Sequence, residues 1–410
     1  MKLNQRGNTV NLSIIGLGAR GYSQLQLLLT MKDVEIVSVC DRYQDRVEKA
    51  QQAVLESRGK KPQGTLVASE AICHKDADAV IIMTSWETHI PLAIEALNNG
   101  KRVALEVGGS SSLEECWQLV HESEKTRIPV MLLENCCYGE TEMALLNMVR
   151  QNVFGTLVHC AGSYGHDLRD EIGLGDINRH YRQNHFLHRN GELYPTHELG
   201  PIANYLHINR GNRMLALTSM ASKACGIHAW FQTNHKQSPL ANTNFSEGDI
   251  VTTMIQCAQG ETILLTHDCT LPRFYSRSGV IRGTKGMWME DGHAMYLDGI
   301  TPVTDWMHRP EEDRPYLEKY RHPLWQEYYA FGVRGGHDGM DYLVLRAFLE
   351  SVQEQKEPPI DVYDAASWMC ITALSEQSIA MGSAPVPIPD FTNGGWCLQQ
   401  EQSHRQEFEL

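Results

Sequence analysis

Long apolar runs are missing from this sequence of 410 residues. No segment reaches the roughly 18 consecutive apolar residues that a membrane-spanning helix needs, so we expect no membrane partner. Residues 1–8 also lack the apolar core that a secretory signal peptide carries. We therefore expect a cytoplasmic protein.

Positive charge and paired cysteines are scarce as well. The chain has 36 Lys and Arg against 50 Asp and Glu, a net charge of −14. We do not expect a nucleic-acid partner, because few cations are left to neutralise phosphates. The 11 cysteines include no C-x-x-C pair, and Cys136 and Cys137 are adjacent. This pattern suits neither a zinc site nor a disulfide framework, and it favours reduced cysteines in a cytoplasmic protein.

The sequence does contain a dinucleotide-binding motif, Gly16-Leu17-Gly18-Ala19-Arg20-Gly21. The motif follows an apolar run and opens a stretch with helical periodicity. Its glycines permit a tight turn and the close approach of a pyrophosphate, whose charge the helix N-terminus favours. Asp41 ends a second apolar run and would accept hydrogen bonds from the adenosine ribose, which favours NAD. Arg42 leaves NADP open, and a glycine-rich turn without a ligand is the structural alternative.

The pattern along the chain predicts an α/β protein with two domains. Strand and helix patterns alternate over the first 135 residues, and the strands are continuous apolar runs, typical of a buried parallel sheet. We predict a doubly wound Rossmann domain over residues 1–136. An α+β domain with a large, mostly antiparallel open sheet should follow over residues 137–410, because successive strand patterns are joined by short turns. Residues 166–190 read as a loop-rich region, and the C-terminal helix could pack back on the first domain.

Two segments of the first domain stand where strands end. One contains Trp86, Glu87, Thr88 and His89, and the other contains Glu106 and Val107. Ligands of open α/β sheets bind at the carboxyl ends of strands, so these segments are candidates for cofactor contact. Thr88 has an alternative role as the N-cap of the following helix. Glu106 marks the place where we expect the nicotinamide.

The second domain concentrates its candidate residues between Tyr181 and His197. Pro195 suits the first turn of a helix, which places His197 at the positive end of the helix dipole. That position lowers a histidine pKa and favours the neutral ring. A neutral imidazole beside Tyr194 is a suitable proton-transfer pair.

Three further features each have a structural and a functional interpretation. His180, His185 and His188 could bind a metal, but surface or loop histidines are the simpler interpretation, since no carboxylate or cysteine completes a recognised spacing. The loop around Tyr275 could simply pack. In Gly335-Gly336-His337-Asp338-Gly339-Met340-Asp341, Asp338 could be the N-cap of the next helix.

These motifs together carry a resemblance to known families. The N-terminal half resembles the glucose–fructose oxidoreductase and inositol dehydrogenase superfamily. The full chain is similar to the NAD-dependent α-N-acetylgalactosaminidases of glycoside hydrolase family 109. The similarity is carried by residues 16–21, 106–107, 134–138, 190–197, 208–213, 272–276, 283–286, 336–341 and 374–378.

The resemblance implies a set of site residues. Its cofactor contacts fall on Ala19, Arg20, Asp41, Trp86, Glu87, Thr88, His89, Glu106, Val107, Asn135 and Tyr194. Its sugar contacts fall on Tyr164, Arg182, Tyr194, Pro195, Thr196, His197 and Tyr275, with Tyr194 and His197 as the catalytic pair. Ordinary dehydrogenases of the superfamily have a lysine after the glutamate, and Val107 takes that place here.

The resemblance also implies a reaction. NAD, tightly bound and recycled, takes a hydride from C3 of a small glycoside; the C1–C2 elimination, water addition and re-reduction that follow hydrolyse the bond without a metal. Two alternatives remain, a net NAD(P)-dependent sugar or polyol dehydrogenase and a non-catalytic NAD or sugar sensor. The open sheet of the second domain, as in the superfamily, suggests a homo-oligomer.

Overall fold

The computed structural model describes residues 9–398. The segment on which the expectation of no signal peptide rests, residues 1–8, therefore lies outside the described residues, as does the end of the predicted second domain. Within the described part, contacts divide the chain into two compact units. The first unit comprises the chain up to Glu140 together with His322–Ala366, and the second comprises Thr141–Arg321 and the chain from Ser367 onward.

The first unit is built on a parallel sheet of six strands in the order β3-β2-β1-β4-β5-β6. Its strands are β1 (Val10–Ile15), β2 (Val34–Cys40), β3 (Gln63–Thr65), β4 (Ala79–Ile82), β5 (Arg102–Leu105) and β6 (Val130–Leu132). Every residue of the central strand β4 is buried, as expected for a strand with helices on both faces. The predicted doubly wound domain is confirmed.

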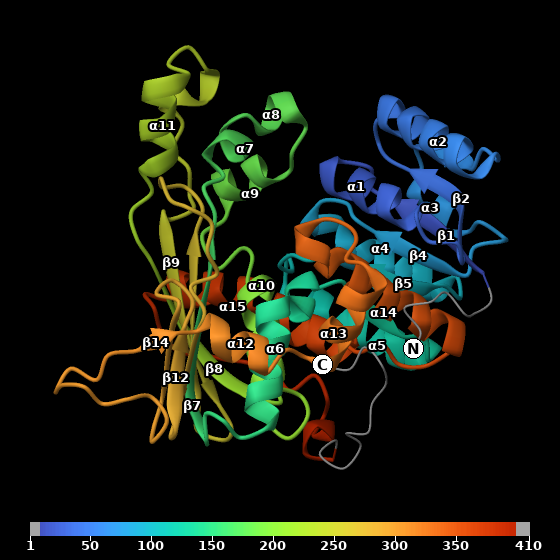
Figure 1. Cartoon of the computed structure of the whole chain (residues 1–410). Helices are drawn as coiled ribbons and strands as arrows, with labels where there is room; N and C mark the ends of the chain where they lie inside the picture. Colours follow the sequence, from blue (N-terminus) through green and yellow to red (C-terminus); the bar gives the residue numbers. More distant parts are fainter. Residues whose placement is uncertain (1–8, 399–410) are drawn as a thin grey trace. The chain divides into compact units, whose positions relative to one another are not determined.

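Five helices connect successive strands of this sheet (Figure 1): α1 (Ala19–Leu28), α2 (Gln44–Arg58), α3 (Ala68–Ile72), α4 (Trp86–Asn98) and α5 (Leu113–Thr126). The unit also contains η1 (Asn135–Tyr138), which follows β6, and α13 (Pro323–Phe331), η3 (His337–Gly339) and α14 (Met340–Glu354), which come from the later segment His322–Ala366. α1 packs beside α2, whereas α3, α4 and α5 are successive neighbours. The strand order reverses between β1 and β4, and at such a switch point the carboxyl ends of the strands form a ligand crevice.

The second unit contains a sheet of nine strands in the order β14-β13-β12-β11-β7-β10-β9-β8-β15. The strands are β7 (Leu157–Gly165), β8 (Met214–Ala221), β9 (Ile250–Cys257), β10 (Thr262–Asp268), β11 (Val280–Gly283), β12 (Gly286–Met289), β13 (Ala294–Leu297), β14 (Glu311–Glu312) and β15 (Val386–Pro387). Only β10 and β7 pair in parallel; the other pairs among the described residues are antiparallel. The predicted mostly antiparallel sheet is confirmed.

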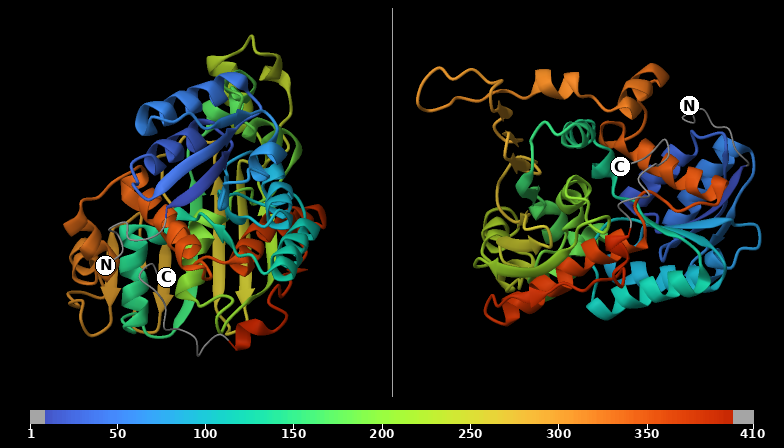
Figure 2. Two further views of the ribbon diagram at one scale, coloured as in Figure 1. Left: turned by 90° about the vertical axis from the view of Figure 1, so that its right-hand side faces the viewer. Right: turned by 90° about the horizontal axis from the view of Figure 1, so that it is seen from below.

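The helices that belong wholly or mostly to the second unit are α6 (Glu140–Arg150), α7 (Arg169–Gly173), α8 (Gly175–Asn178), α9 (Arg182–His188), α10 (Thr196–Tyr205), α11 (Gly226–Asn234), η2 (Pro239–Asn242), α12 (Arg314–Lys319), α15 (Val362–Ala380) and η4 (Gly395–Cys397). Two of them, α10 and α15, lie against one face of the sheet. Gly162 of β7 leaves room for Glu198 and Ile202 of α10. On the same face, the N–H of Ser219 donates to Ser378 of α15 at 2.9 Å, so α15 lies against β8 (Figure 2).

Three local expectations were wrong. Residues 166–190 contain the short helices α7, α8 and α9 instead of a loop, because helices this short leave little hydrophobic periodicity to read. α4 begins at Trp86, so Ser85 occupies the N-cap and Thr88 lies inside the first turn. α14 begins at Met340 after Gly339, and Asp338 lies inside η3 in a left-handed conformation with φ 53°.

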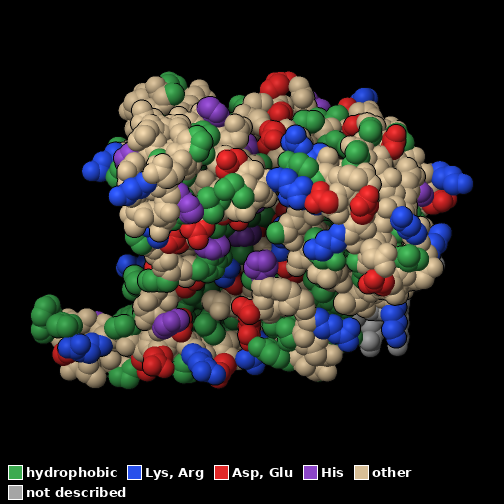
Figure 3. Space-filling view, turned by 90° about the horizontal axis from the view of Figure 1, so that it is seen from above, with side chains coloured by type: hydrophobic (Ala, Val, Ile, Leu, Met, Phe, Trp, Pro, Cys, Tyr) green, Lys and Arg blue, Asp and Glu red, His purple; other side chains and the backbone are tan. Residues whose placement is uncertain are grey.

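Two general features of the described chain bear on function. None of its helices combines the length and hydropathy that crossing a membrane requires. All 11 cysteines lie in this part and none forms a disulfide there. On the face drawn in Figure 3, acidic and basic side chains are interspersed.

Candidate functional site

The turn between β1 and α1 is shaped for close backbone approach. Gly16 has φ +94°, a left-handed conformation, and a Cβ there would collide with the carbonyl oxygen of Met83. A Cβ on Gly21 would collide with the carbonyl oxygen of Gly16. Positions 16 and 21 therefore require glycine. Between them, Gly18 is the N-cap of α1. The cradle left by the missing side chains suits a pyrophosphate at the helix N-terminus.

Asp41 directly follows β2 and stabilises the turn between β1 and α1. Its buried carboxylate accepts the N–H of Leu17 at 2.7 Å and the N–H of Tyr43 at 3.0 Å. Arg46 lies 3.6 Å from the same carboxylate. A carboxylate offers about four acceptor positions, so Asp41 retains capacity for the two hydroxyls of a ribose. The geometry of Asp41 is therefore compatible with its predicted role, which is to accept hydrogen bonds from the adenosine ribose.

The segment after β4 forms the start of α4. Trp86 and His89 are buried, whereas Glu87 is exposed. Thr88 Oγ1 donates to Thr84 Oγ1 at 2.7 Å, and His89 Nε2 lies 3.0 Å from the carbonyl oxygen of Thr84. Thr88 and His89 thus hold the loop that leads from β4 into α4. Their contact with a cofactor stays a prediction.

An ion-pair network joins the ends of several elements in the first unit. Arg20 Nε donates to Glu106 Oε2 at 2.9 Å, and Arg20 Nη1 donates to Asp341 Oδ2 at 2.7 Å. Asn135 Nδ2 donates to Asp341 Oδ1 at 2.9 Å. The structure therefore brings together three predicted cofactor residues, and the buried Val107 follows Glu106 directly. The glycine cradle and this network fit a dinucleotide.

The predicted sugar residues of the second unit form an aromatic cluster. The ring of Tyr164 lies 4.4 Å from the ring of Tyr194 and 5.6 Å from that of His197, centroid to centroid. Tyr194 Oη lies 3.5 Å from His197 Nε2. The guanidinium of Arg182 lies 5.0 Å from the centroid of the Tyr194 ring. Aromatic and cationic groups gathered in this way can hold a pyranose and its hydroxyls.

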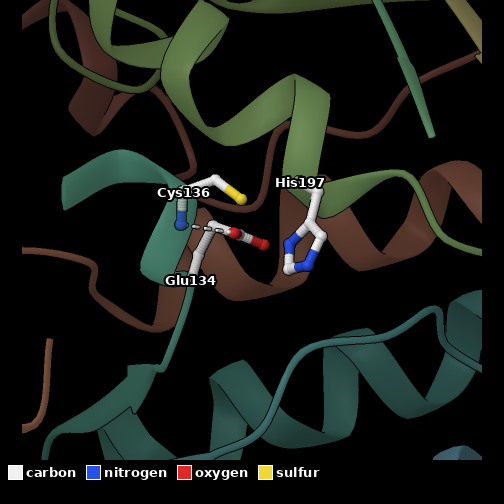
Figure 4. Close-up of side chains that lie close together, drawn as sticks. All are labelled: Glu134, Cys136 and His197. Carbon is white, nitrogen blue, oxygen red and sulfur yellow. Dashed lines mark hydrogen bonds between the residues drawn. The ribbon is translucent and has the colours of Figure 1, made fainter. Parts of the chain in front are cut away.

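The start of α10 positions the catalytic candidates. α10 begins at Thr196, with Pro195 at its N-cap and His197 in its first turn, as predicted. Thr196 is fully buried, whereas His197 is half-buried. Figure 4 shows His197 on this turn and, on the chain that leads into η1, the carboxylate of Glu134 accepting the N–H of Cys136 at 3.0 Å.

Charged and titratable neighbours surround Tyr164. Arg182 Nη1 donates to Tyr164 Oη at 3.4 Å, and His166 Nδ1 lies 3.3 Å from the same oxygen. Burial raises the pKa of Tyr164 above its ordinary value. Burial also lowers the pKa of His166, and the charge of Arg182 adds to that effect. Tyr164 therefore stays a neutral phenol that can donate one hydrogen bond.

Tyr275 lies at the edge of this cluster. Its ring contacts His166 at 5.1 Å, and the residue is 49% exposed. The structure thus brings the predicted sugar residues together. Tyr275 contacts His166, which in turn contacts Tyr164.

Two buried residues, His267 and Glu247, lie next to the aromatic cluster. The ring of His267 stacks on Tyr164 at 6.3 Å, and His267 Nδ1 lies 3.2 Å from a carboxylate oxygen of Glu247. Glu247 also accepts the N–H of Gly191 at 3.0 Å and so anchors the segment that leads to Tyr194. Burial lowers the pKa of His267 to about 3 and raises the pKa of Glu247. Burial thus disfavours the charged form of both groups, and we describe them as a support for the aromatic cluster.

The structure does not gather the alternative metal ligands. His180 Nε2 lies 3.5 Å from Glu171, and the ring of His185 packs against Tyr181. Among the described residues, His180, His185 and His188 do not form a group whose ligand atoms lie within 4.8 Å of one another. They are not arranged as a three-histidine site.

Sequence reasoning missed four residues of these clusters. They are His166, Glu247, His267 and Asp341. Asp341 belongs to the glycine-rich segment 335–341, in which the sequence suggested a capping role for Asp338 only. Glu247 and His267 carried no local signal, because their partners lie on other elements. Burial of a charged residue is a property of the fold, and the sequence pattern around these residues does not reveal it.

Comparison with protein families covers nearly the whole described chain. Residues 138–398 match the family described as "Glycosyl hydrolase 109, C-terminal domain". Residues 10–133 match the family described as "Oxidoreductase family, NAD-binding Rossmann fold".

Curated relatives match over almost their full length. A "Glycosyl hydrolase family 109 protein" of Stenotrophomonas maltophilia is 40% identical over 417 residues, which covers 95% of this chain and 91% of the relative. An "Alpha-N-acetylgalactosaminidase" of Tannerella forsythia is 38% identical, covering 94% of this chain and 87% of the relative. Another protein of that name, from Shewanella oneidensis, is 37% identical over 94% of this chain and 86% of its own length.

Solved structures share the fold at low identity. An oxidoreductase of Agrobacterium radiobacter, in complex with NAD+, L-tartaric acid and magnesium, has a TM-score of 0.66 and 16% identity, covering 93% of this chain and 99% of its own. A scyllo-inositol dehydrogenase of Lactobacillus casei with bound NAD(H) and scyllo-inositol has a TM-score of 0.63 and 14% identity, with 93% and 99% covered. These likenesses show a common architecture.

Proposed function

This chain belongs to glycosyl hydrolase family 109, and from that premise we propose that it is an NAD-dependent glycosidase acting on small glycosides. Relatives named alpha-N-acetylgalactosaminidases support a terminal α-linked N-acetylgalactosamine as the substrate. The observation that carries the proposal is the presence, in one chain, of a glycine cradle for a dinucleotide and a Tyr-His-Arg cluster suited to a sugar.

The chemistry needs no pair of catalytic carboxylates. When bound, NAD⁺ supplies the reversible removal of a hydride from C3 of the sugar. A carbonyl at C3 acidifies the proton on C2, so a base can take that proton while the bond from C1 to the leaving group breaks. Water adds across the resulting double bond, which restores the proton at C2 and places a hydroxyl on C1. Because the hydride returns to C3, the cofactor is not consumed, and we propose that it stays tightly bound between turnovers.

Tyr194 and His197 are the residues proposed to move protons. Their polar atoms lie 3.5 Å apart, so a proton can pass between them within one hydrogen bond. One of the pair would accept the C3 hydroxyl proton and the other the C2 proton. Arg182 and Tyr164, joined at 3.4 Å, would hold the sugar hydroxyls or the leaving-group oxygen, and Tyr275 would contact the sugar from the edge.

The test is a panel of nitrophenyl α- and β-glycosides with NADH absorbance followed in parallel. The proposal predicts release of nitrophenol from one glycoside without net accumulation of NADH. Accumulation of NADH with an intact glycosidic bond would identify a sugar or polyol dehydrogenase instead. Cofactor binding with no turnover of any sugar would identify a sensor.

The open face of the second sheet supports a homo-oligomer of this chain. Side chains in register across seven strands form one row on that face: Thr218, Met254, Leu264, Ala161, Val280, Met289 and Ala294. Met254 is 44% exposed and Met289 is 38% exposed in the isolated chain. A mainly apolar row of this length favours burial against an identical row in a second copy, face to face.

We propose that the protein works in the cytoplasm. The 11 cysteines of the described chain, most of them buried, form no disulfide there, which is typical of a reducing compartment.

A further inference from the structure

Asp341 is a buried, multiply hydrogen-bonded carboxylate of the first unit that the proposed function leaves without a role. It lies in the first turn of α14 and is 1% exposed. One oxygen accepts the side-chain amide of Asn135 at 2.9 Å. The other accepts Arg20 Nη1 at 2.7 Å and lies 2.9 Å from His337 Nδ1. Three side chains from three different segments therefore meet on one buried carboxylate.

The partners of Asp341 connect it to the strand ends. Arg20 uses a second nitrogen, Nε, to donate to Glu106 at 2.9 Å, so Asp341 is linked to the end of β5 through a single guanidinium. Asn135 opens η1, immediately beyond β6. The carboxyl ends of neighbouring strands such as β5 and β6 are where the nicotinamide half of a dinucleotide lies in a doubly wound sheet.

The charge balance keeps this arrangement intact. Burial alone would raise the pKa of Asp341, but the hydrogen bond from His337 and the charge of Arg20 lower it below its ordinary value. The ionised form of Asp341 is therefore favoured. A partly buried ion pair of this kind holds its geometry, because removal of one partner leaves the buried carboxylate uncompensated.

The adenosine half of the site is organised separately. Asp41 fastens the glycine turn through the N–H of Leu17, and neither residue contacts Asp341 or its partners by a hydrogen bond among the described residues. Disruption of Asp341 should thus act on one end of the dinucleotide only.

We propose that Asp341 is a positioning residue for the nicotinamide end of the cofactor site, which it orders by fixing Arg20 and Asn135 and, through Arg20, Glu106. The proposal rests on the NAD-binding part of the proposed function. It assigns a role to the Gly-Gly-His-Asp-Gly-Met-Asp segment, residues 335–341, which neither the glycine motif nor the sugar cluster explains.

The experiment is a calorimetric titration of the full-length protein, freed of co-purified cofactor, with NAD⁺ and separately with AMP. For D341N we expect the Kd for NAD⁺ to rise at least about tenfold, while the Kd for AMP changes by less than about twofold. AMP lacks the nicotinamide half, so it reports on the Asp41 end and the glycine turn. The matched control is D338N, since Asp338 is exposed and its left-handed backbone accepts asparagine. It should leave both affinities unchanged.

A second variant covers the case in which D341N does not fold. His337→Ala removes one partner of Asp341, and its side chain is 57% exposed, so the fold tolerates the change. We expect it to weaken NAD⁺ binding about threefold without an effect on AMP. Unchanged NAD⁺ binding in these variants, or equal weakening of NAD⁺ and AMP, overturns the proposal. If the unmodified protein binds no NAD⁺, the proposed function itself fails, which is a separate result.

Discussion

Tyr194 and His197 are the residues whose replacement separates chemistry from cofactor binding. We expect Tyr194→Phe and His197→Ala each to lower kcat for glycoside cleavage by at least about 100-fold, since each removes a proton-transfer group. Neither residue belongs to the glycine turn, and Tyr194→Phe keeps the ring of a predicted cofactor contact, so the affinity for NAD⁺ should change little. Steady-state kinetics and NAD⁺ titration check both statements.

A matched control for the tyrosine change is Tyr296→Phe. Tyr296 lies on β13, and its hydroxyl bonds with His308 away from the aromatic cluster. It should leave kcat within about twofold of the unmodified protein. Full activity in both Tyr194→Phe and His197→Ala would remove this pair from the mechanism.

Glu192, next to these residues in the chain, makes stability depend on pH. Burial raises the pKa of Glu192 to about 8 from 4.5, although the N–H of Tyr194 works against the shift. Between these two values the folded protein keeps a proton that the unfolded chain has lost. The stabilising contribution is therefore fully present below about pH 4.5, and it is lost as the pH rises to 8, at up to about 1.4 kcal/mol per pH unit.

Glu192→Gln should flatten that dependence, because the amide is neutral at every pH. Urea unfolding between pH 5 and pH 8 measures the free energy of unfolding for both proteins. We expect the unmodified protein to lose stability towards pH 8 and the variant to lose less. Parallel curves for the two proteins would show that Glu192 does not hold the extra proton.

At the scale of elements, the turn between β1 and α1 is the most sensitive position. Gly16→Ala adds a Cβ that meets the carbonyl oxygen of Met83 at a backbone conformation with φ +94°. We expect the Kd for NAD⁺ to rise at least about tenfold, because the turn must shift away from the pyrophosphate. Titration of the purified variant with NAD⁺ provides the measurement.

Gly59→Ala is the matched control for that change. Gly59 ends α2 with φ +71°, and no atom lies within 4 Å of a Cβ placed there. It carries the same kind of backbone strain without a collision, so it should lower stability slightly and leave NAD⁺ binding unchanged. Equal loss of NAD⁺ affinity in both variants would show that strain, and not the shape of the turn, is responsible.

Elements with a strong pattern could be predicted from the sequence, and short ones could not. β9 alternates buried and exposed residues along Ile250–Cys257, so its strand period was readable. α8 spans only Gly175–Asn178 and offers no period. The glycine turn and Asp41 were found because their spacing is local. Asp341 was not, because its partner Arg20 lies 321 residues away and only the fold brings them together.

At the scale of the whole molecule, the compact units do not follow the chain in one pass. The first unit takes up His322–Ala366, which lies in the chain between the two segments of the second unit. The sequence suggested that the C-terminal helix could pack back on the first domain, but it did not mark where such a return begins or ends, because the helices involved look like any amphipathic helix. The predicted boundary at residue 136 and its two continuous domains remain a prediction about folding units.

The open sheet face gives a prediction about assembly. Met254→Arg places a charge within the row that we propose as the contact between two copies. We expect the molar mass measured by light scattering to fall to that of one chain, because burial of an unpaired charge opposes association. Leu66→Arg, a similar change at a position 49% exposed in the first unit, is the control and should leave the mass unchanged. A single-chain mass for the unmodified protein would contradict the proposal.

Transient oxidation of the sugar at C3 is tested most directly by hydrolysis of a nitrophenyl α-N-acetylgalactosaminide in D₂O. The account predicts one deuterium at C2 of the released sugar, seen by NMR, with no net gain of NADH. Release of the sugar with its original hydrogen at C2 would show that no elimination took place, and this result would contradict the redox mechanism.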